Sequence, residues 1–194
     1  MVHNAGAADF VGAEPERVLK AVFGYDSFRP FQKEIIASVL AGKDTLAVMP
    51  TGGGKSLCCQ IPALIFDGLT IVVSPLIALM QDQVSALAEN GVSAVFLNST
   101  LEWDDYRKAS DDIRSGKIKL VYVSPEGLAT ERLKDLFCSD GVKVSCVTID
   151  EAHCISEWGH DFRPDYLELA SVRHLFSDAV CLALTATATA PVRA

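Results

Sequence analysis

Short apolar segments alternate with amphipathic ones along most of the chain. Six short segments are rich in β-branched side chains and nearly continuous in apolar residues: 45–49, 70–74, 94–97, 120–123, 144–149 and 180–184. Runs of this kind are typical of strands that are buried on both faces of a parallel sheet. The pattern predicts a three-layer α/β fold with a mainly parallel central sheet and right-handed crossovers.

The segments between these strands have the spacing of helices. Pro15 and Pro30 each suit a first helical position, so we expect one helix over 15–22 and another from Pro30 to about Val39, closed by Gly42. Four further helices are expected. One begins at Lys55, one ends at about Glu89, one spans 103–114 and one lies near Leu133. Residues 1–14 are expected to form a flexible N-terminus, which leaves 15–194 as one domain.

Composition narrows the class of protein. The chain has 194 residues, 49% of them hydrophobic and 22% charged, which is ordinary for one folded domain. Its net charge of −8 argues against a dedicated nucleic-acid-binding module, which usually carries a basic face. Any nucleic-acid surface must therefore be local or shared with other segments.

The cysteines and the N-terminus point to a reducing compartment. No C-x-x-C pair occurs, so we expect neither a zinc site nor disulfides, and the six thiols should be buried small hydrophobes. Residues 1–14 lack the charged start and apolar core of a signal peptide, and no apolar run approaches the ~20 residues of a membrane span. We expect no membrane association and a cytoplasmic protein, nucleoid-associated in a prokaryote or nuclear in a eukaryote.

A glycine-rich turn, Pro-Thr-Gly-Gly-Gly-Lys-Ser over 50–56, follows the first predicted strand. Glycines let successive backbone N–H groups converge on one anion at the positive end of a helix dipole. Lys55 would reach the outer phosphates of ATP, and Ser56 would ligate Mg²⁺. The strict G-x-x-x-x-G-K-S pattern fails at its first glycine, which is Met49 here. The alternative is a strand-to-helix turn with an incidental lysine. The candidate nucleotide-binding residues of this turn are Thr51, Gly52, Gly53, Gly54, Lys55 and Ser56.

Two adjacent carboxylates follow the strand predicted over 144–149. Asp150 and Glu151 would lie at its carboxyl end, where α/β sheets bind ligands. In P-loop ATPases an acidic residue here holds Mg²⁺, and a neighbouring glutamate orients or deprotonates the attacking water. We assign Asp150 to the metal, Glu151 to the water and His153 to the γ-phosphate side. An Asp-Glu pair by itself also suits a plain helix N-terminus, but the glycine turn favours the catalytic interpretation.

The carboxylates are followed by a loop that contains Trp, His, Phe, Arg and Tyr, side chains that suit stacking on bases and pairing with phosphates. Residues 150–166 closely resemble motif II and the aromatic-rich loop of RecQ-family DNA helicases of superfamily 2. Five other segments are similar to further motifs of that family, in family order: 23–32 to motif 0, 49–56 to motif I, 73–83 to motif Ia, 123–126 to motif Ib and 184–189 to motif III. The resemblance implies the first RecA-like lobe of an ATP-dependent 3′ to 5′ DNA helicase, with P-loop NTPase fold, over 15–194.

The resemblance also assigns an adenine site to motif 0. Gln32 offers one acceptor and one amide donor, which match the N6/N7 edge of adenine. Tyr25 or Arg29 would stack on the ring or flank it. The alternative for this segment is an amphipathic helix start that places Phe28 and Phe31 in the core.

Contacts to DNA are implied at several further positions. In the loop, the aromatic and guanidinium groups would sense single-stranded DNA by stacking and phosphate pairing, with His160 relaying that contact toward His153. The alternative is a packed surface loop whose tryptophan covers the core. Ser74 and Ser124 are each followed by proline, and the alternative for both is an ordinary strand-end turn. Thr185 and Thr187 would couple the nucleotide site to DNA. The candidate DNA-binding residues are Ser74, Gln81, Ser124, Trp158, His160, Phe162 and Arg163.

The motifs cover only the first of the two lobes of such a helicase. The expected partners are single-stranded or duplex DNA and a second lobe of the same parent chain, which would carry an arginine finger typically worth ~10³ to 10⁵ in turnover. The 194 residues alone are therefore expected to bind ATP weakly and to hydrolyse it hardly at all. The alternatives are a nucleotide-binding regulatory or scaffold module and an RNA helicase lobe.

Overall fold

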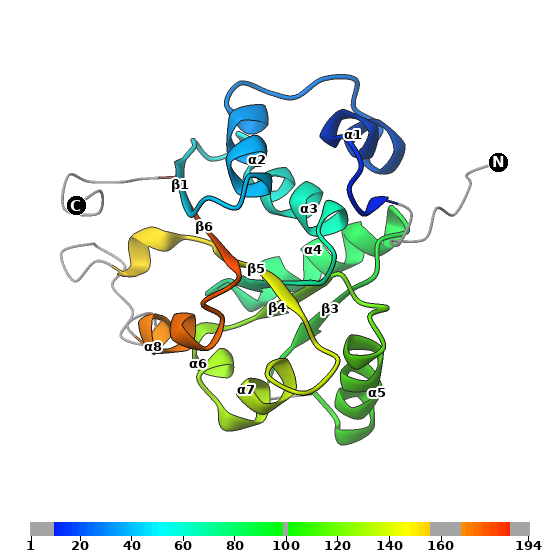
Figure 1. The fold of residues 1–194 in the computed structure, drawn as a ribbon, viewed down its shortest axis with the longest axis vertical. Helices are drawn as coiled ribbons and strands as arrows, with labels where there is room; N and C mark the ends of the chain where they lie inside the picture. The colour runs from blue at the N-terminus through cyan, green and yellow to red at the C-terminus, as the bar shows by residue number, and fades with distance from the viewer. Residues whose placement is uncertain (1–9, 99–100, 156–167, 187–194) are drawn as a thin grey trace.

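A parallel sheet forms the middle of the molecule. The structure, a computed structural model, describes residues 10–98, 101–155 and 168–186. Its strands are β1 (Thr45–Val48), β2 (Leu69–Val73), β3 (Ala94–Leu97), β4 (Leu120–Val123), β5 (Val144–Ile149) and β6 (Val180–Thr185). They lie in the order β1-β6-β5-β2-β4-β3, and every pair of neighbours is parallel (Figure 1). The predicted fold class is confirmed.

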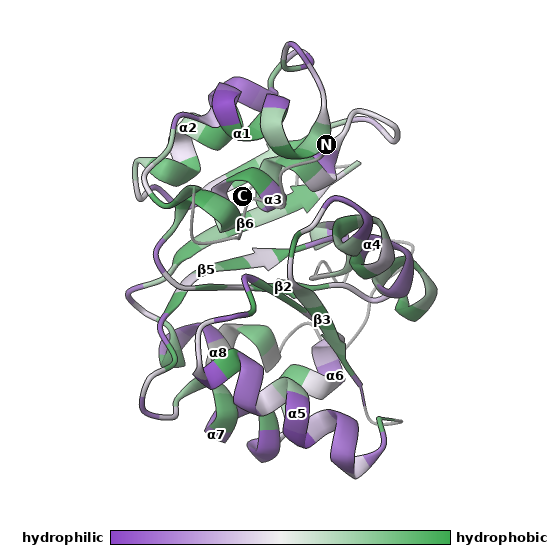
Figure 2. Cartoon of the chain, turned by 90° about the vertical axis from the view of Figure 1, so that its right-hand side faces the viewer, coloured by the Kyte–Doolittle hydropathy of each residue, from purple (hydrophilic) through white to green (hydrophobic). Residues whose placement is uncertain are grey.

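Helices cover both faces of this sheet. One layer contains α1 (Pro15–Phe23), α2 (Gln32–Leu40), α3 (Lys55–Ile65) and α4 (Ile77–Glu89). The other contains α5 (Trp103–Arg114), α6 (Pro125–Leu128), α7 (Glu131–Phe137) and α8 (Glu168–Leu175). A 3₁₀ turn, η2 (Ala152–Ile155), follows β5. In Figure 2 the apolar strands lie between these two helical layers.

The hydrophobic core is divided by the sheet into two clusters. Side chains of one strand alternate between them: Val72 of β2 belongs to the cluster under α1 to α4, whereas Ile71 and Val73 belong to the cluster under α5 to α8. This is the two-residue period that a strand buried on both faces must have. It explains why the strands read as almost unbroken apolar runs.

The carboxyl ends of the strands are level with one another. Val73, the last residue of β2, pairs with Val123 at the end of β4 and with Ile149 at the end of β5. Val48 of β1 pairs with Thr185 of β6. The turns and acidic residues that follow these strands therefore meet at one edge of the sheet.

Two expectations about local structure were wrong. The second helix begins at Gln32 and not at Pro30, because Phe31 has a left-handed φ of 69°, which lies outside the helical region. All six cysteines are free and four of them are buried, but Cys138 follows α7 and is exposed. None of the described helices is long and apolar enough to cross a membrane.

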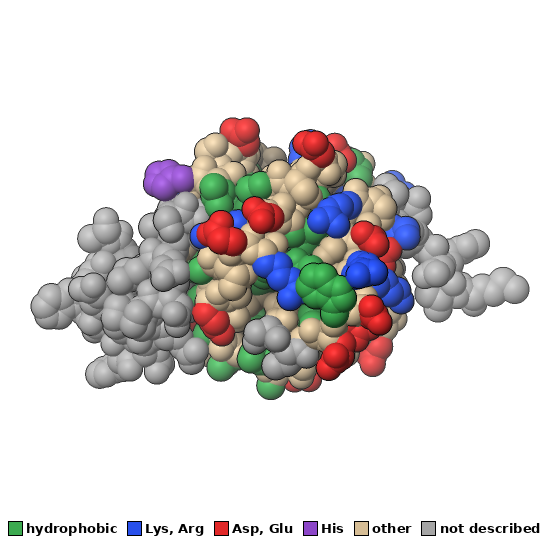
Figure 3. Space-filling model, turned by 90° about the horizontal axis from the view of Figure 1, so that it is seen from below, with side chains coloured by type: hydrophobic (Ala, Val, Ile, Leu, Met, Phe, Trp, Pro, Cys, Tyr) green, Lys and Arg blue, Asp and Glu red, His purple; other side chains and the backbone are tan. Residues whose placement is uncertain are grey.

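The outer surface of the second helical layer carries charges of both signs. Figure 3 shows acidic and basic side chains interspersed on this face. Arg132 at the start of α7 lies over the rings of Trp103 and Tyr106 on α5, with its Cζ atom 4.8 Å and 3.3 Å from the two ring centres. This cation–π contact ties α5 to α7.

Candidate nucleotide-binding site

The glycine-rich turn joins β1 to α3 at the carboxyl edge of the sheet. Gly52 and Gly54 have left-handed φ angles of 78° and 82°, and Gly54 caps the N-terminus of α3. A Cβ atom added at Gly54 would lie 2.4 Å from Nε2 of Gln32, and one at Gly53 would lie 2.9 Å from the carbonyl oxygen of Pro50. The chain can take this path only with glycine at these positions.

Met49 stands where the strict phosphate-binding pattern has its first glycine. Its backbone N–H donates to the carbonyl oxygen of Thr185 at 2.9 Å, and its side chain is buried in the core. The position thus prolongs the pairing of β1 with β6 and does not belong to the turn. This explains why the turn forms without that glycine.

Lys55, the first residue of α3, contacts one carboxylate of the acidic pair. Its Nζ atom lies 3.2 Å from Oε1 of Glu151, and Nδ1 of His153 lies 3.2 Å from Oε2 of the same carboxylate. His153 Nδ1 also lies 3.0 Å from Oγ1 of Thr185 at the end of β6. A continuous chain of polar contacts therefore runs from α3 through η2 to β6.

The backbone holds Asp150 and Glu151 in a fixed turn. The N–H of Asp150 donates to the carbonyl oxygen of Val73, and Oδ1 of Asp150 accepts from the N–H of Glu151. Glu151 has a φ of 50°, which is uncommon for a residue with a side chain. Burial, followed by the charge of Glu151, raises the pKa of the Asp150 carboxyl, whereas Lys55 acts in the opposite direction.

These groups line a cavity of about 190 Å³, which we call the phosphate cavity. Six of the predicted site residues border it: Thr51, Gly52, Lys55, Ser56, Asp150 and Glu151. The described residues contain no group of three or more His, Cys, Asp or Glu side chains that could hold a metal ion. Ser56 and Asp150 still suit Mg²⁺, which is commonly bound through one or two protein oxygens together with water and substrate phosphates.

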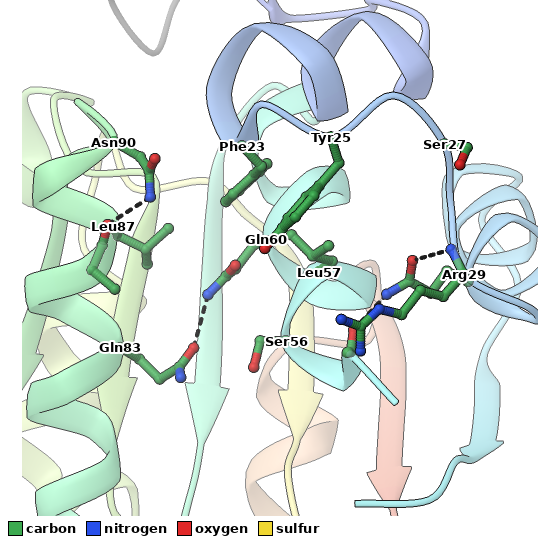
Figure 4. Close-up of a pocket in the computed structure, with 13 residues that line it drawn as sticks. Phe23, Tyr25, Ser27, Arg29, Ser56, Leu57, Gln60, Gln83, Leu87 and Asn90 are labelled. Atoms are coloured by element: carbon green, nitrogen blue, oxygen red, sulfur yellow. Dashed lines mark hydrogen bonds between the residues drawn. The ribbon is translucent and has the colours of Figure 1, made fainter. Parts of the chain in front are cut away.

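A second cavity of about 250 Å³, the base cavity, lies between α3, α4 and the segment after α1. Tyr25, Arg29 and Gln32 line it, as do Phe23 and Leu57 (Figure 4). Tyr25 is 54% exposed, which leaves its ring available for stacking. The structure thus gathers all three residues predicted for the adenine site around one cavity.

Gln32 is engaged differently from the expectation. It is only 1% exposed, its Oε1 accepts from the backbone N–H of Arg29, and its Nε2 donates to the carbonyl oxygen of Gly54. Nη1 of Arg29 donates to the carbonyl oxygen of Gly52 at 2.6 Å. Both residues therefore brace the glycine turn in this structure. Phe28 packs against the core and Phe31 is exposed, so the alternative interpretation holds for the first and is wrong for the second.

The predicted DNA-binding residues are not alike in their surroundings. Gln81 is exposed on α4, whereas Ser74 and Ser124 are buried. Oγ of Ser124 accepts from the N–H of Gly127 and caps α6, which favours the interpretation as a strand-end turn. Trp158, His160, Phe162 and Arg163 lie outside the described residues, as does Thr187.

The prediction from sequence missed three polar residues between the cavities. Nε2 of Gln60 lies 2.9 Å from Oε1 of Gln83 and 3.4 Å from the hydroxyl of Tyr122. Gln60 lines the base cavity, Tyr122 lines the phosphate cavity, and Gln83 lines both. The available signal was two glutamines on the inward faces of helices whose other inward residues are apolar.

Comparison with known proteins places these features in context. Residues 29–194 match the family model described as DEAD/DEAH box helicase. The chain is 54% identical over 171 residues to ATP-dependent DNA helicase RecQ of Haemophilus influenzae, covering 88% of this chain and 27% of that protein. It is 48% identical over 179 residues to the Bacillus subtilis protein of the same name, covering 91% of this chain and 30% of that protein. The chain thus spans less than a third of the length of these relatives.

Solved structures show the same fold at much lower identity. The crystal structure of the DUF1998 helicase MrfA has a TM-score of 0.72 at 20% identity and matches 91% of this chain and 29% of that one. The Mycobacterium smegmatis helicase Lhr, bound to ssDNA and AMP-PNP, has a TM-score of 0.70 at 18% identity and matches 96% of this chain and 26% of that one. These likenesses support the fold alone.

Proposed function

This chain belongs to the DEAD/DEAH box helicase family, and from that premise we propose that it forms the ATP-binding lobe of a RecQ-like ATP-dependent DNA helicase. In this proposal Mg-ATP binding and hydrolysis are coupled to contact with single-stranded DNA, and the parent protein translocates 3′ to 5′. The 54% identity to a protein named ATP-dependent DNA helicase supports the choice of substrate class.

One observation carries the nucleotide part of the proposal. Lys55 and Glu151, 96 residues apart, lie 3.2 Å from each other at the carboxyl edge of the sheet. Each is buried enough to be held in place, with side-chain exposures of 15% and 24%. A lysine at a helix N-terminus and a carboxylate at a strand end form the two sides of a triphosphate site.

The residues of the phosphate cavity take separate roles in hydrolysis. The backbone N–H groups of the glycine turn and the amine of Lys55 hold the β- and γ-phosphates. Ser56 and Asp150 would hold Mg²⁺, which neutralises charge on the phosphates when it is bound. Glu151 orients the attacking water and accepts its proton.

His153 connects that chemistry to the rest of the lobe. Its Nδ1 atom lies near both the Glu151 carboxylate and the hydroxyl of Thr185. A movement of the carboxylate would therefore shift His153 and, through it, the contact with the end of β6. The chain continues from η2 toward Trp158 and Arg163, the side chains proposed to contact single-stranded DNA. DNA contact and hydrolysis are thereby linked through one short segment.

Part of the catalytic site and of the DNA-binding surface lies outside these 194 residues. A second lobe of the parent chain supplies the arginine finger and further DNA contacts, so the 194 residues alone bind ATP weakly and turn it over hardly at all. This agrees with the net charge of −8, which favours a lobe that shares its DNA affinity with other segments.

The experiment is an ATPase assay of the full-length parent protein, with no nucleic acid, with single-stranded DNA and with single-stranded RNA. We expect DNA to stimulate wild type and Trp158→Ala to lose that stimulation with ATP affinity unchanged. Lys55→Ala should lose ATP binding. Stimulation by RNA alone would assign an RNA helicase lobe, and ATP binding without stimulated turnover would assign a regulatory module.

A further inference from the structure

Gln83 occupies the place where the two cavities of the site meet. Among the residues that the structure describes, Ser56 and Gln83 are the two that line both the base cavity and the phosphate cavity. Ser56 belongs to the first turn of α3, directly after the glycine turn, whereas Gln83 belongs to α4. Gln83 is thus a side chain from outside the glycine turn that borders both cavities.

One end of the Gln83 amide is already held. Its Oε1 accepts from Nε2 of Gln60 at 2.9 Å, which ties α4 to α3 beside the base cavity (Figure 4). Gln60 is 6% exposed and approaches the hydroxyl of the buried Tyr122. Polar groups buried in this way are costly unless they are paired, so this short network fixes the orientation of the amide.

The other end of the amide is available to a ligand. Within the part of the chain that the structure describes, Nε2 of Gln83 makes no hydrogen bond. Since Oε1 is turned toward Gln60, the amide N–H groups remain as donors at the junction of the cavities. Phosphate and ribose oxygens are acceptors for such a donor.

The helix that carries Gln83 also carries a residue predicted to contact DNA. Gln81 is exposed and Gln83 is half-buried, as expected for positions two apart, which are about 200° apart around a helix. One turn of α4 therefore presents one amide to solvent and another to the two cavities. A shift of α4 that brings Gln83 to a nucleotide moves Gln81 as well.

We propose that Gln83 is a positioning residue that couples nucleotide binding to the contact that α4 makes with single-stranded DNA through Gln81. With nucleotide present, the Gln83 amide donates to an oxygen of the nucleotide and, through Gln60, locks α4 against α3, which sets the position of Gln81. Without nucleotide, the Gln83 amide keeps only its hydrogen bond with Gln60. This inference deepens the proposed function and requires that the lobe bind both ATP and DNA.

The test compares two Kd values for single-stranded DNA in the full-length parent protein, one without nucleotide and one with it, and takes their ratio. The Kd for a fluorescent single-stranded DNA is determined with no nucleotide and with saturating AMP-PNP, in wild type and in Gln83→Met, which keeps the length of the side chain without its amide. Wild type should show a ratio of at least about fivefold, the lower end of ordinary allosteric coupling. Gln83→Met should bring that ratio to within about twofold of one.

Three further variants separate coupling from other effects. Gln83→Glu keeps the acceptor for Gln60 and loses the donor, so it should fold as stably as wild type in thermal unfolding and still lose the coupling. Gln81→Ala should weaken DNA binding and bring the ratio toward one with nucleotide affinity unchanged, because it removes the DNA contact whose position Gln83 is proposed to set. Ser85→Ala, at an exposed position of the same helix, should change neither.

The outcomes distinguish this inference from the proposed function. A wild-type ratio retained in both Gln83→Met and Gln83→Glu would overturn the coupling role and leave the helicase lobe intact. A wild-type ratio of one, with both ligands bound, would overturn it in the same way. Absence of nucleotide or DNA binding by wild type would instead refute the proposed function, and the inference with it.

Discussion

The phosphate cavity and the base cavity are adjacent but are built in different ways. The phosphate cavity is formed by backbone at strand ends, by the glycine turn and by side chains that contact one another directly, such as Lys55 and Glu151. The base cavity is formed by side chains from α3, α4, the start of α2 and the segment after α1. Backbone geometry leaves little freedom, whereas side chains such as Gln32 can exchange partners. Substitutions in the phosphate cavity should therefore have the larger effects.

The largest effect is expected at Glu151. Glu151→Gln removes the group that accepts the proton of the attacking water, so DNA-stimulated turnover of the parent protein should fall about 10²- to 10⁴-fold. ATP affinity should stay close to wild type, because the side chain still fills the cavity. A coupled phosphate-release assay and a titration with fluorescent ATP separate the two quantities. Glu89→Gln, at an exposed position on α4, is the control. Unchanged turnover would remove Glu151 from the chemistry.

Gly54 tests whether backbone geometry decides the phosphate cavity. In Gly54→Ala the added Cβ would lie 2.4 Å from Nε2 of Gln32 at a φ of 82°, so the turn must distort. Nucleotide affinity should fall about 100-fold, a loss of roughly 3 kcal/mol. Gly42→Ala is a matched control, since Gly42 has a φ of 76° and an added Cβ there would meet nothing within 4 Å. Isothermal titration should show a loss only for Gly54→Ala, and equal losses would contradict the argument.

A smaller effect is expected in the base cavity. Gln32→Ala removes two hydrogen bonds, one to Arg29 and one to Gly54, and takes away the only group proposed to read the edge of adenine. ATP affinity should fall about tenfold, the size expected for one or two such bonds, and the preference for ATP over GTP should narrow. Competition binding measures both. If affinity falls while the preference persists, Gln32 only braces the turn. Glu34→Ala, exposed on the same helix, should change neither.

The smallest effect concerns stability without ligand. Burial and the neighbouring Glu151 carboxylate raise the pKa of Asp150, so its charged form is disfavoured in the folded protein. Asp150→Asn should raise the free energy of unfolding of the nucleotide-free chain at pH 7, by less than about 2 kcal/mol. It should also weaken Mg-dependent nucleotide binding. Urea denaturation tests the first statement, with the exposed Asp135→Asn as control. A destabilised variant would show that Asp150 is held mainly by favourable contacts.

The difference between the two cavities also explains which of their features could be predicted from the sequence. The phosphate-binding turn is a local feature, because glycines, lysine and helix start follow one another in the chain. The base cavity depends on packing between separate helices. The resemblance pointed to Tyr25, Arg29 and Gln32, which line one cavity, but the hydrogen bonds of Gln32 to Arg29 and Gly54 were not foreseen. Gln60 and Gln83 were missed for the same reason.

The sequence by itself determined the six strands, the parallel sheet and the order of the helices, because β-branched apolar runs and helical periodicity are properties of neighbouring residues. It also determined which residues stand at the strand ends. Only the tertiary structure decided that Lys55 contacts Glu151, that His153 reaches Thr185 and that Gln83 lies where two cavities meet. Contacts between residues far apart in the chain depend on strand order and side-chain packing, which no local pattern encodes.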